Sequence, residues 1–309
     1  QQSPNDIGAQ DVGSAGGRVQ LSPATENKLP VVYGDAWMAP IITDAKISTD
    51  QQTMWYVLSF SEASDVGSYS FGDVTWDGKV LLFDENNPSE IVAWYDESSG
   101  PSPQRVTGVA GKISMWFFNS SGAQVAHRCR NLDGTGQQYL NSGGQTAIQL
   151  LQDGGIDPVN HWSSTDVMSG TIFAVMRVIY DADHGVTGLG QIRAEVKNTI
   201  GKTTGADNGT GPGSVIKDYL LNDRYGCGVP LENIDIDSLA ALDDFAYANG
   251  TFTLTDTDGN TITNDYRYRI NGIVDTTQNC LSNLNSIAEC CDCWIQWNEL
   301  SGKWGVVIN

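Results

Sequence analysis

Cationic side chains are scarce in this sequence. Its 309 residues include 17 Lys and Arg against 37 Asp and Glu, which gives a net charge of −20. Surfaces that bind nucleic acid by neutralising phosphates need clustered Lys and Arg, so we expect no specific nucleic-acid binding. The same excess of negative charge repels DNA, which suits a lumen through which DNA must pass without adhering. Plain solubility is an equally good explanation of the charge.

Long apolar runs are missing as well. No stretch approaches the roughly 20 apolar residues of a membrane-spanning helix, and the chain opens with a polar, Gly-rich stretch in place of a secretory signal. It begins without Met and stops inside an expected strand, so we expect the full gene product to be longer.

Cysteine is rare, and its spacing excludes a small disulfide-stapled domain. The cysteines are Cys129, Cys227, Cys280, Cys290, Cys291 and Cys293. Their even number permits disulfides, but we predict mostly reduced thiols.

Cys290 and Cys293 form a C-x-x-C pair within an expected helix, where both would lie on one face and could ligate one metal ion. A structural zinc or iron–sulfur site normally needs a second such pair, which the sequence lacks. A redox pair favours a helix N-terminus, whereas this pair would lie at a C-terminus. We therefore interpret these thiols as buried apolar groups and expect no metal and no cofactor.

Short aromatic and β-branched runs dominate the chain from Leu29 onwards, which is typical of strands. The Asp77-Gly78 pair in "WDGK" supplies the positive φ angles of a tight hairpin turn. We predict a mainly β fold with an α+β C-terminal part, built from barrel-like or sandwich-like domains with short helices. The expected divisions are 1–28 (an extended lead-in), 29–118 (a β-rich domain), 119–169 (an inserted loop-rich subdomain with one helical turn near Ala147) and 170–309 (an α+β domain).

Within the C-terminal part, the pattern predicts a buried strand over 170–181 that pairs with a strand over 190–198. Helices are expected at 214–222, 235–250 and 277–294, the second with Asp235 or Asp237 as its N-cap. The expected apolar stripe of the third helix comprises Leu281, Leu284, Ala288 and Cys291. Hairpins are expected around Asp258-Gly259 and around Ser301-Gly302.

Catalytic signals are weak throughout. None of His127, His161 and His184 lies in a sequence context typical of a catalytic triad, and no H-E-x-x-H motif occurs. We interpret the acidic pairs at 235/237 and 243/244 as helix caps and solvated helix faces, not as a general acid and base. The run "TDTDGN" resembles a calcium loop, but Arg267 occupies the position where a carboxylate is required. The residues specify no enzyme.

The stretch "DYLLNDRYGCGVPLENIDIDSL", from Asp218 to Leu239, carries two glycines and a proline at one corner between two expected helices. Together with the later "YRYRING", an Asp-Thr step into a helix, and "GKWGVVI", this stretch resembles the central tail-tip hub of long-tailed phages, the tip attachment protein J family. The upstream segment "LPVVYG" is also similar to that family. The resemblance covers about the last hundred residues and some eighty in the first half, but not 119–165.

The resemblance implies a homotrimeric structural protein of the virion, located at the tail tip and assembled in the host cytoplasm. Such a hub closes or lines the end of the tail tube and opens for DNA ejection. Its partners would be the distal tail protein, the tape measure protein and the tail fibres or receptor-binding proteins, with the host envelope contacted indirectly. The residues that we expect to build a structural corner or a subunit interface are Arg224, Tyr225, Gly226, Gly228, Pro230 and Asp275.

At this corner we predict that Tyr225 packs as an anchor between helices or subunits and that Arg224 pairs with a carboxylate. A corner with contacts only inside the chain is the alternative. Two further functions stay open: a hub-associated cell-wall-degrading enzyme, and a carbohydrate-binding β module suggested by nine Trp and eleven Tyr. Packing in cores and interfaces explains those aromatic residues first.

Overall fold

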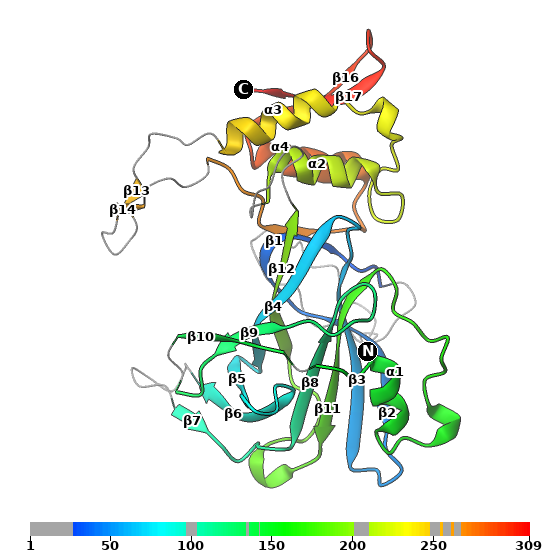
Figure 1. The fold of residues 1–309 in the computed structure, drawn as a ribbon, viewed down its shortest axis with the longest axis vertical. Coiled ribbons are helices and arrows are strands. Elements are labelled where there is room, and N and C mark those ends of the chain that lie inside the picture. Colours follow the sequence, from blue (N-terminus) through cyan, green and yellow to red (C-terminus); the bar gives the residue numbers. More distant parts are fainter. Residues whose placement is uncertain are drawn as a thin grey trace, which may run out of the picture.

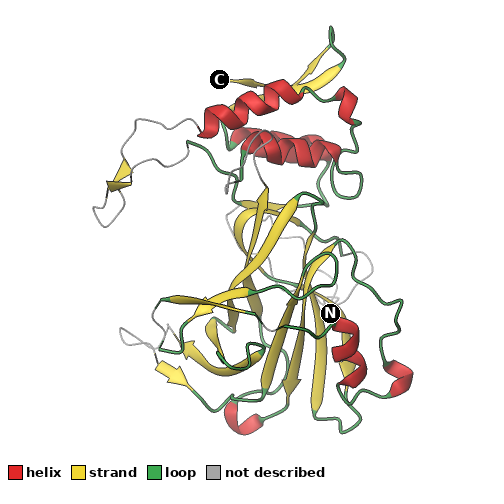
Figure 2. Cartoon of the chain, in the orientation of Figure 1, coloured by secondary structure: helices red, strands yellow, loops and turns green. Residues whose placement is uncertain are grey.

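The computed structural model describes residues 27–96, 104–133, 136–141, 143–200, 210–247, 254–255, 261–262 and 267–309. Strands account for 42% of the described structure and helices for 20%, so the prediction of a mainly β fold is confirmed. Figure 2 shows most of the strands gathered in one body, with the longer helices and a two-stranded hairpin at one end of it.

Eight strands close into a barrel (Figure 1). In neighbouring order they are β4 (Gly67–Trp76), β12 (Ile192–Ile200), β1 (Val31–Met38), β3 (Thr53–Glu62), β11 (Thr171–Ile179), β8 (Ile113–Phe118), β6 (Glu90–Asp96) and β5 (Lys79–Phe83). Pairing of β5 with β4 completes the ring. Every neighbouring pair is antiparallel except β1 and β3, which are parallel. Closure gives each of these strands two neighbours and so removes unpaired edges from the ring.

The turn that joins β4 to β5 is the predicted Asp77-Gly78 hairpin. Both residues have positive φ angles, 49° for Asp77 and 79° for Gly78. That conformation matches the twist of the flanking strands, so the local sequence directs the pairing that closes the barrel.

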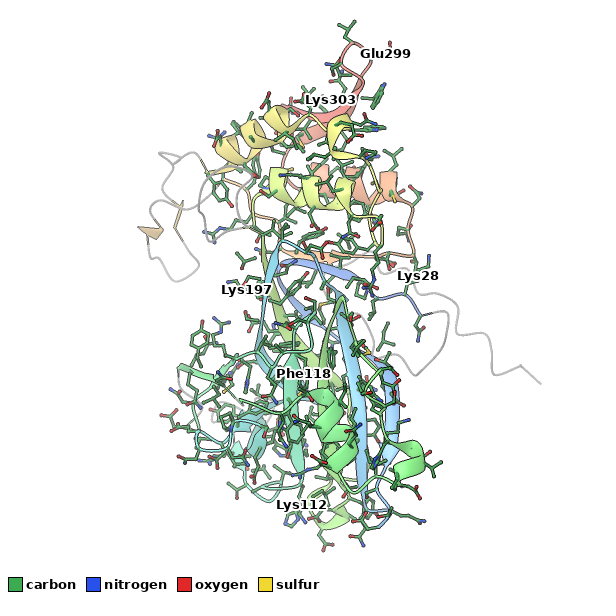
Figure 3. The ribbon with its side chains drawn as sticks, turned by 45° about the vertical axis from the view of Figure 1, so that its right-hand side comes forward. Lys28, Lys112, Phe118, Lys197, Glu299 and Lys303 are labelled. Carbon is green, nitrogen blue, oxygen red and sulfur yellow. The ribbon has the colours of Figure 1, made fainter. Side chains whose placement is uncertain are left out.

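Large apolar side chains fill the barrel because alternate residues of each strand point inward. Phe60, Phe71, Phe83 and Phe117 are at most 1% exposed. The rings of Phe71 and Phe117 have centroids 4.7 Å apart. Figure 3 shows side chains packed densely in this part of the molecule.

Residues 119–169 add two strands to the sheet of the barrel and one helix to its outside. β9 (His127–Arg130) pairs with β4, and β10 (Gln137–Leu140) pairs with β9. The predicted helical turn is α1 (Ala147–Asp153), capped by Thr146 and packed outside the barrel against Trp55 and Phe118. Three further strands extend the sheet: β2 (Ile41–Ile47) pairs with β3, β7 (Gln104–Val106) with β6, and β15 (Gly272–Val274) with β1. The chain also forms the short helices η2 (Pro158–Asn160) and η3 (Ala182–His184).

The predicted pairing between the strands at 170–181 and 190–198 is wrong. β11 lies between β3 and β8, whereas β12 lies between β1 and β4. Both strands form, but the barrel offers each of them other partners. The expected division at residue 170 therefore runs through one continuous sheet, since β11 and β12 belong to the same ring as β1, β3, β4, β5, β6 and β8.

The C-terminal elements build a second core on the end of the barrel near β1, β12 and β15. They are α2 (Pro212–Leu221), η4 (Leu231–Asn233), α3 (Ile236–Tyr247), α4 (Cys280–Glu289) and the hairpin of β16 (Cys293–Asn298) with β17 (Lys303–Ile308). The N-cap of α3 is Asp235, whose Oδ1 accepts a hydrogen bond from Ser238 N. No helix among the described residues is long and apolar enough to cross a membrane.

Two C-terminal hairpins were predicted. β16 and β17 confirm the one around Ser301-Gly302. β13 (Leu254–Thr255) and β14 (Thr261–Ile262) pair as antiparallel strands, while the turn expected at Asp258-Gly259 and the "DTDGN" run lie outside the described residues.

The third predicted helix is shorter than expected. α4 ends at Glu289, Asp292 has a positive φ of 52°, and Cys293 begins β16. Cys290 and Cys293 therefore do not share a helix face. Leu284, Ala288 and Cys291 of the expected apolar stripe are buried, whereas Leu281 is 56% exposed and Ile287 completes the buried side of α4 instead.

Candidate functional site

The main-chain amides of the Arg224–Gly228 corner donate hydrogen bonds back to α2 and to its C-cap, Asn222. Asn222 Oδ1 accepts from Arg224 N at 2.9 Å and from Tyr225 N at 3.1 Å. The Cys227 amide donates to Tyr219 O at 2.9 Å. These bonds satisfy groups that the end of a helix would leave without partners.

Both glycines of the corner are required by its geometry within the chain. A Cβ on Gly226 would lie 2.0 Å from Tyr219 O. Gly228 has a φ of +62°, which disfavours residues with a side chain. Pro230 then precedes η4 as its N-cap.

Tyr225 anchors the corner on a buried carboxylate. Its hydroxyl donates to Asp218 Oδ2 at 2.7 Å, and the hydroxyl of Tyr33 on β1 donates to the same oxygen at 2.7 Å. Ser64, just after β3, donates to Asp218 Oδ1 at 2.6 Å. One carboxylate from α2 therefore joins the corner to two strands of the barrel.

Burial sets the protonation of this cluster. Loss of solvent raises the pKa of Tyr33 well above its usual value, and the neighbouring Asp218 carboxylate raises it further. The pKa of Tyr225 is raised for the same two reasons. Both phenols therefore stay protonated and keep donating hydrogen bonds across the physiological pH range.

Arg224 makes the second link between the corner and the barrel, and Glu62 at the end of β3 is the carboxylate that was expected. Arg224 Nε lies 2.7 Å from Glu62 Oε2, and Arg224 Nη1 donates to Ser169 O at 3.2 Å. Burial raises the pKa of Glu62, and the guanidinium opposes that shift.

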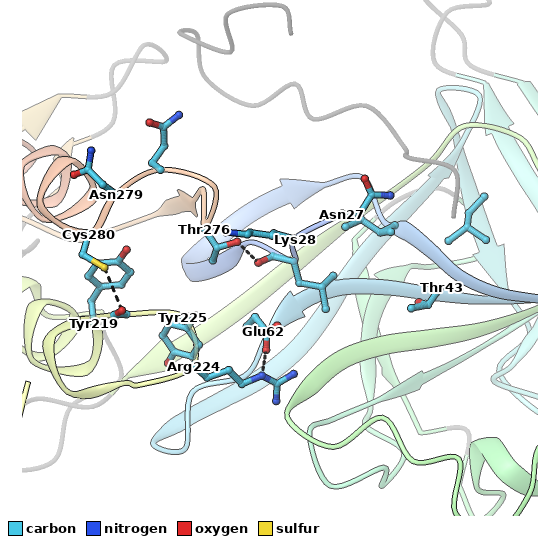
Figure 4. Close-up of a pocket in the computed structure, with 15 residues that line it drawn as sticks. Asn27, Lys28, Thr43, Glu62, Tyr219, Arg224, Tyr225, Thr276, Asn279 and Cys280 are labelled. Carbon is cyan, nitrogen blue, oxygen red and sulfur yellow. Dashed lines mark hydrogen bonds and ion pairs between the residues drawn. The ribbon is translucent and has the colours of Figure 1, made fainter. Parts of the chain in front are cut away.

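A groove of about 1030 Å³ opens beside these links, between β2 and β3 on one side and the corner and α4 on the other (Figure 4). Arg224, Tyr225 and Gly226 line it. Thr276 also lines it and donates to Leu29 O at 2.7 Å. Of the other predicted residues, Gly228, Pro230 and Asp275 do not belong to the lining.

Asp275 has a local role in the connection between β15 and α4. Its carboxylate accepts from Thr277 N at 2.9 Å and from Thr277 Oγ1 at 2.7 Å. Its carbonyl accepts from Asn283 Nδ2 at 2.9 Å. The residue therefore shapes the entry to α4.

Sequence reasoning missed Asp218, Tyr33, Ser64 and Glu62 as partners of the corner. Asp218 and Tyr33 lie in "DYLLNDRYGCGVPLENIDIDSL" and "LPVVYG", two of the segments that resemble the hub family. That resemblance was the only signal that pointed to these residues. Nothing local indicates that residues 185 positions apart share a hydrogen bond.

Two side chains considered for catalysis lie in structural surroundings. Asp243, considered as a possible acid or base, is buried and accepts from Gly213 N at 2.7 Å and from Ser214 Oγ at 2.6 Å, so it caps α2. His127 is buried among Phe83 and Phe117 inside the barrel, far in the fold from the groove. No group of three or more His, Cys, Asp or Glu that could hold a metal ion occurs among the described residues.

No protein-family model matches this chain, and no curated protein matches it.

Proposed function

We propose that this chain is a structural protein of a phage virion, a homotrimeric tail-tip hub. It closes or lines the end of the tail tube, opens for DNA ejection, and has no enzymatic activity. Its neighbours are the distal tail protein, the tape measure protein and the tail fibres or receptor-binding proteins. Residues beyond the barrel form the α+β part of the hub.

The observation that carries the proposal is the corner itself. The segment with the strongest resemblance to tail-tip hubs is the one that fastens the C-terminal helices to the closed barrel, through Asp218 and the Arg224–Glu62 pair. The domains of a hub subunit must keep a fixed arrangement while neighbouring proteins exert force on the subunit. A buried carboxylate that accepts three hydrogen bonds, as Asp218 does, favours one defined packing.

The β16–β17 hairpin supports contacts between subunits. Its exposed apolar side chains include Trp294 (59% exposed), Trp297 (42%), Val307 (44%) and Leu300 (101%). Large apolar side chains that stay exposed together on one hairpin are typical of surfaces that a partner covers.

The net charge of −20 fits a duct for DNA. Three such chains around one axis would surround the passage with negative charge, which repels the phosphate backbone. Opening would then be a shift between two packed arrangements, with no bond made or broken.

Immunogold labelling of purified phage particles with an antibody to this chain tests the proposal. We expect label at the tail tip and, in the complex released by detergent, a mass that corresponds to three copies. Protein found only in the lysate, with unlabelled particles, would refute the virion assignment. A cleared band on a peptidoglycan zymogram would instead favour a cell-wall-degrading enzyme.

One observation favours a second candidate, a carbohydrate-binding surface on the barrel. Trp37 is 40% exposed and lines a hollow of about 510 Å³ together with Thr75, Asp77 and Arg193. An exposed indole beside a few hydrogen-bonding groups is typical of sites that stack a sugar ring. Retention on a glycan column that Trp37→Ala abolishes and Trp294→Ala leaves intact would establish this function.

A further inference from the structure

Cys291 and Cys293 are brought together by the turn between α4 and β16. Their Sγ atoms lie 3.5 Å apart, within hydrogen-bonding distance for thiols. Asp292 between them has a φ of 52°, and this left-handed residue turns both side chains to the same side of the chain. In the helix that the sequence predicted, Cys290 and Cys293 would share a face, and Cys291 and Cys293 would point to different sides.

Hydrogen bonds hold both Cys291 and Asp292 in the turn between α4 and β16. The Cys291 amide donates to Ala288 O at 3.1 Å. The Asn309 amide donates to Asp292 O at 3.1 Å, and Asn309 Nδ2 donates to Asp292 Oδ1 at 3.1 Å. These bonds, together with the pairing of Cys293 with Ile308, hold the backbone on both sides of Asp292 and keep the two thiols close.

We propose that Cys291 and Cys293 are a modification site, which a small-molecule disulfide such as glutathione disulfide oxidises to an internal disulfide. A disulfide requires a sulfur–sulfur distance of about 2.05 Å, so the thiols must approach by roughly 1.5 Å, through side-chain rotation and a small adjustment of the turn. Cys227 and Cys280 also interact through a side-chain hydrogen bond, so the position of any cross-link has to be read from the peptide that carries it.

The pair has a distinct nucleophile and a distinct resolving thiol. The hydrogen bond between the two thiols lowers the pKa of Cys293. The same interaction, together with burial, raises the pKa of Cys291. Both thiols belong to the second core, and Cys293, at 5% exposed, is the less buried of the two because Cys291 is fully buried.

The reaction balances as two thiol–disulfide exchanges. The Cys293 thiolate attacks one sulfur of glutathione disulfide, which forms a mixed disulfide and releases one glutathione thiolate. The Cys291 thiolate then attacks the Cys293 sulfur and expels the second glutathione. Two cysteines are oxidised, one disulfide is reduced to two thiols, and the two thiol protons pass to the released glutathiones.

The bond would fix the start of β16 to the end of α4. That joint carries the hairpin with the exposed residues Trp294 and Trp297. Oxidation therefore gives this hairpin a more rigid base, and the effect depends on no assumption about the partner.

The test uses the purified full chain, incubated with glutathione disulfide, quenched with an alkylating reagent, digested and analysed by mass spectrometry. We expect the peptide that contains residues 290–293 to lose two hydrogens and to lose alkylation at both Cys291 and Cys293. Alkylation of the neighbouring Cys290, which is exposed, should remain.

Matched variants decide the assignment. Cys290→Ser should leave the cross-link intact, whereas Cys291→Ala should stop the reaction at a glutathione adduct on Cys293. Circular dichroism of each variant shows whether it folds. Loss of the cross-link in Cys290→Ser, a bond that uses Cys290, or full alkylation of Cys291 and Cys293 after prolonged oxidation would each overturn the proposal. None of these outcomes bears on the location of the chain in a virion.

Discussion

Asp218 is the single residue whose loss we expect to cost the most at the junction. It accepts hydrogen bonds from Tyr33, Tyr225 and Ser64, and its side chain is almost fully buried. Asp218→Ala leaves three buried hydroxyls without this partner, so we expect the free energy of unfolding to fall by about 3 kcal/mol. Urea unfolding measures the change. Asp223→Ala, at an exposed position of the same corner, is the control and should change it by less than about 0.5 kcal/mol.

We expect the Arg224–Glu62 ion pair beside Asp218 to contribute much less to the free energy of unfolding. Arg224 is 48% exposed, so solvent screens its attraction to Glu62. Arg224→Ala should lower the free energy of unfolding by less than about 1 kcal/mol. An effect as large as that of Asp218→Ala, measured by the same urea unfolding, would mean that the ion pair and not the buried cluster holds the junction.

His127 makes stability depend on pH. Burial inside the barrel lowers its pKa to about 3, well below the ordinary value of 6.5. As pH falls below about 6.5 the unfolded chain binds a proton at this residue and the folded chain does not, so stability decreases down to about pH 3. Between pH 7 and pH 4.5 we expect this residue to account for roughly 2 to 3 kcal/mol of lost stability.

His127→Phe should remove that part of the acid sensitivity, because phenylalanine cannot be protonated. Urea unfolding of both proteins at the two pH values tests this. The control is His184→Gln, at a site 47% exposed, which should keep the acid sensitivity of the original chain. Equal loss of stability in the original chain and in His127→Phe would contradict the expectation.

The β4–β5 hairpin closes the barrel with few residue pairs. Only Thr75 with Val80 and Trp76 with Lys79 are paired between the two strands. Its turn depends on Gly78, which has a φ of 79° and open space where a Cβ would lie. Gly78→Ala should therefore cost about 1 kcal/mol through backbone conformation alone. Thermal unfolding should show a lower midpoint.

Gly188→Ala is the matched control for that change. Gly188 also has open space around a Cβ, but its φ lies outside the left-handed region. We expect its unfolding midpoint to stay near that of the original chain. A similar decrease in both variants would show that the turn conformation is not the cause.

For the whole molecule, the charge of −20 predicts the absence of DNA binding. In a gel-mobility assay at low salt, where electrostatic attraction is strongest, duplex DNA should migrate unchanged in the presence of the chain. A basic DNA-binding protein in the same gel confirms that the assay responds. Retardation by this chain that disappears with added salt would reveal a cationic surface and contradict the expectation.

The local sequence was enough for features that depend on neighbouring residues. The Asp77-Gly78 turn, the Asp235 cap and the existence of α2 follow from backbone sterics and hydrogen bonds within a few residues. The mainly β composition follows from alternating apolar residues. These effects act over a short stretch of chain, so they can be recognised in a single sequence.

Only the tertiary structure decided which strands are neighbours and which polar groups meet. β12 pairs with β1 and β4 instead of β11, and Asp218 joins Tyr33 across 185 residues. The Cys291–Cys293 pair arose because α4 ended early and a left-handed Asp292 turned the chain. Such partners are chosen by closing the barrel and by satisfying buried polar groups all at once, and no short segment contains that information.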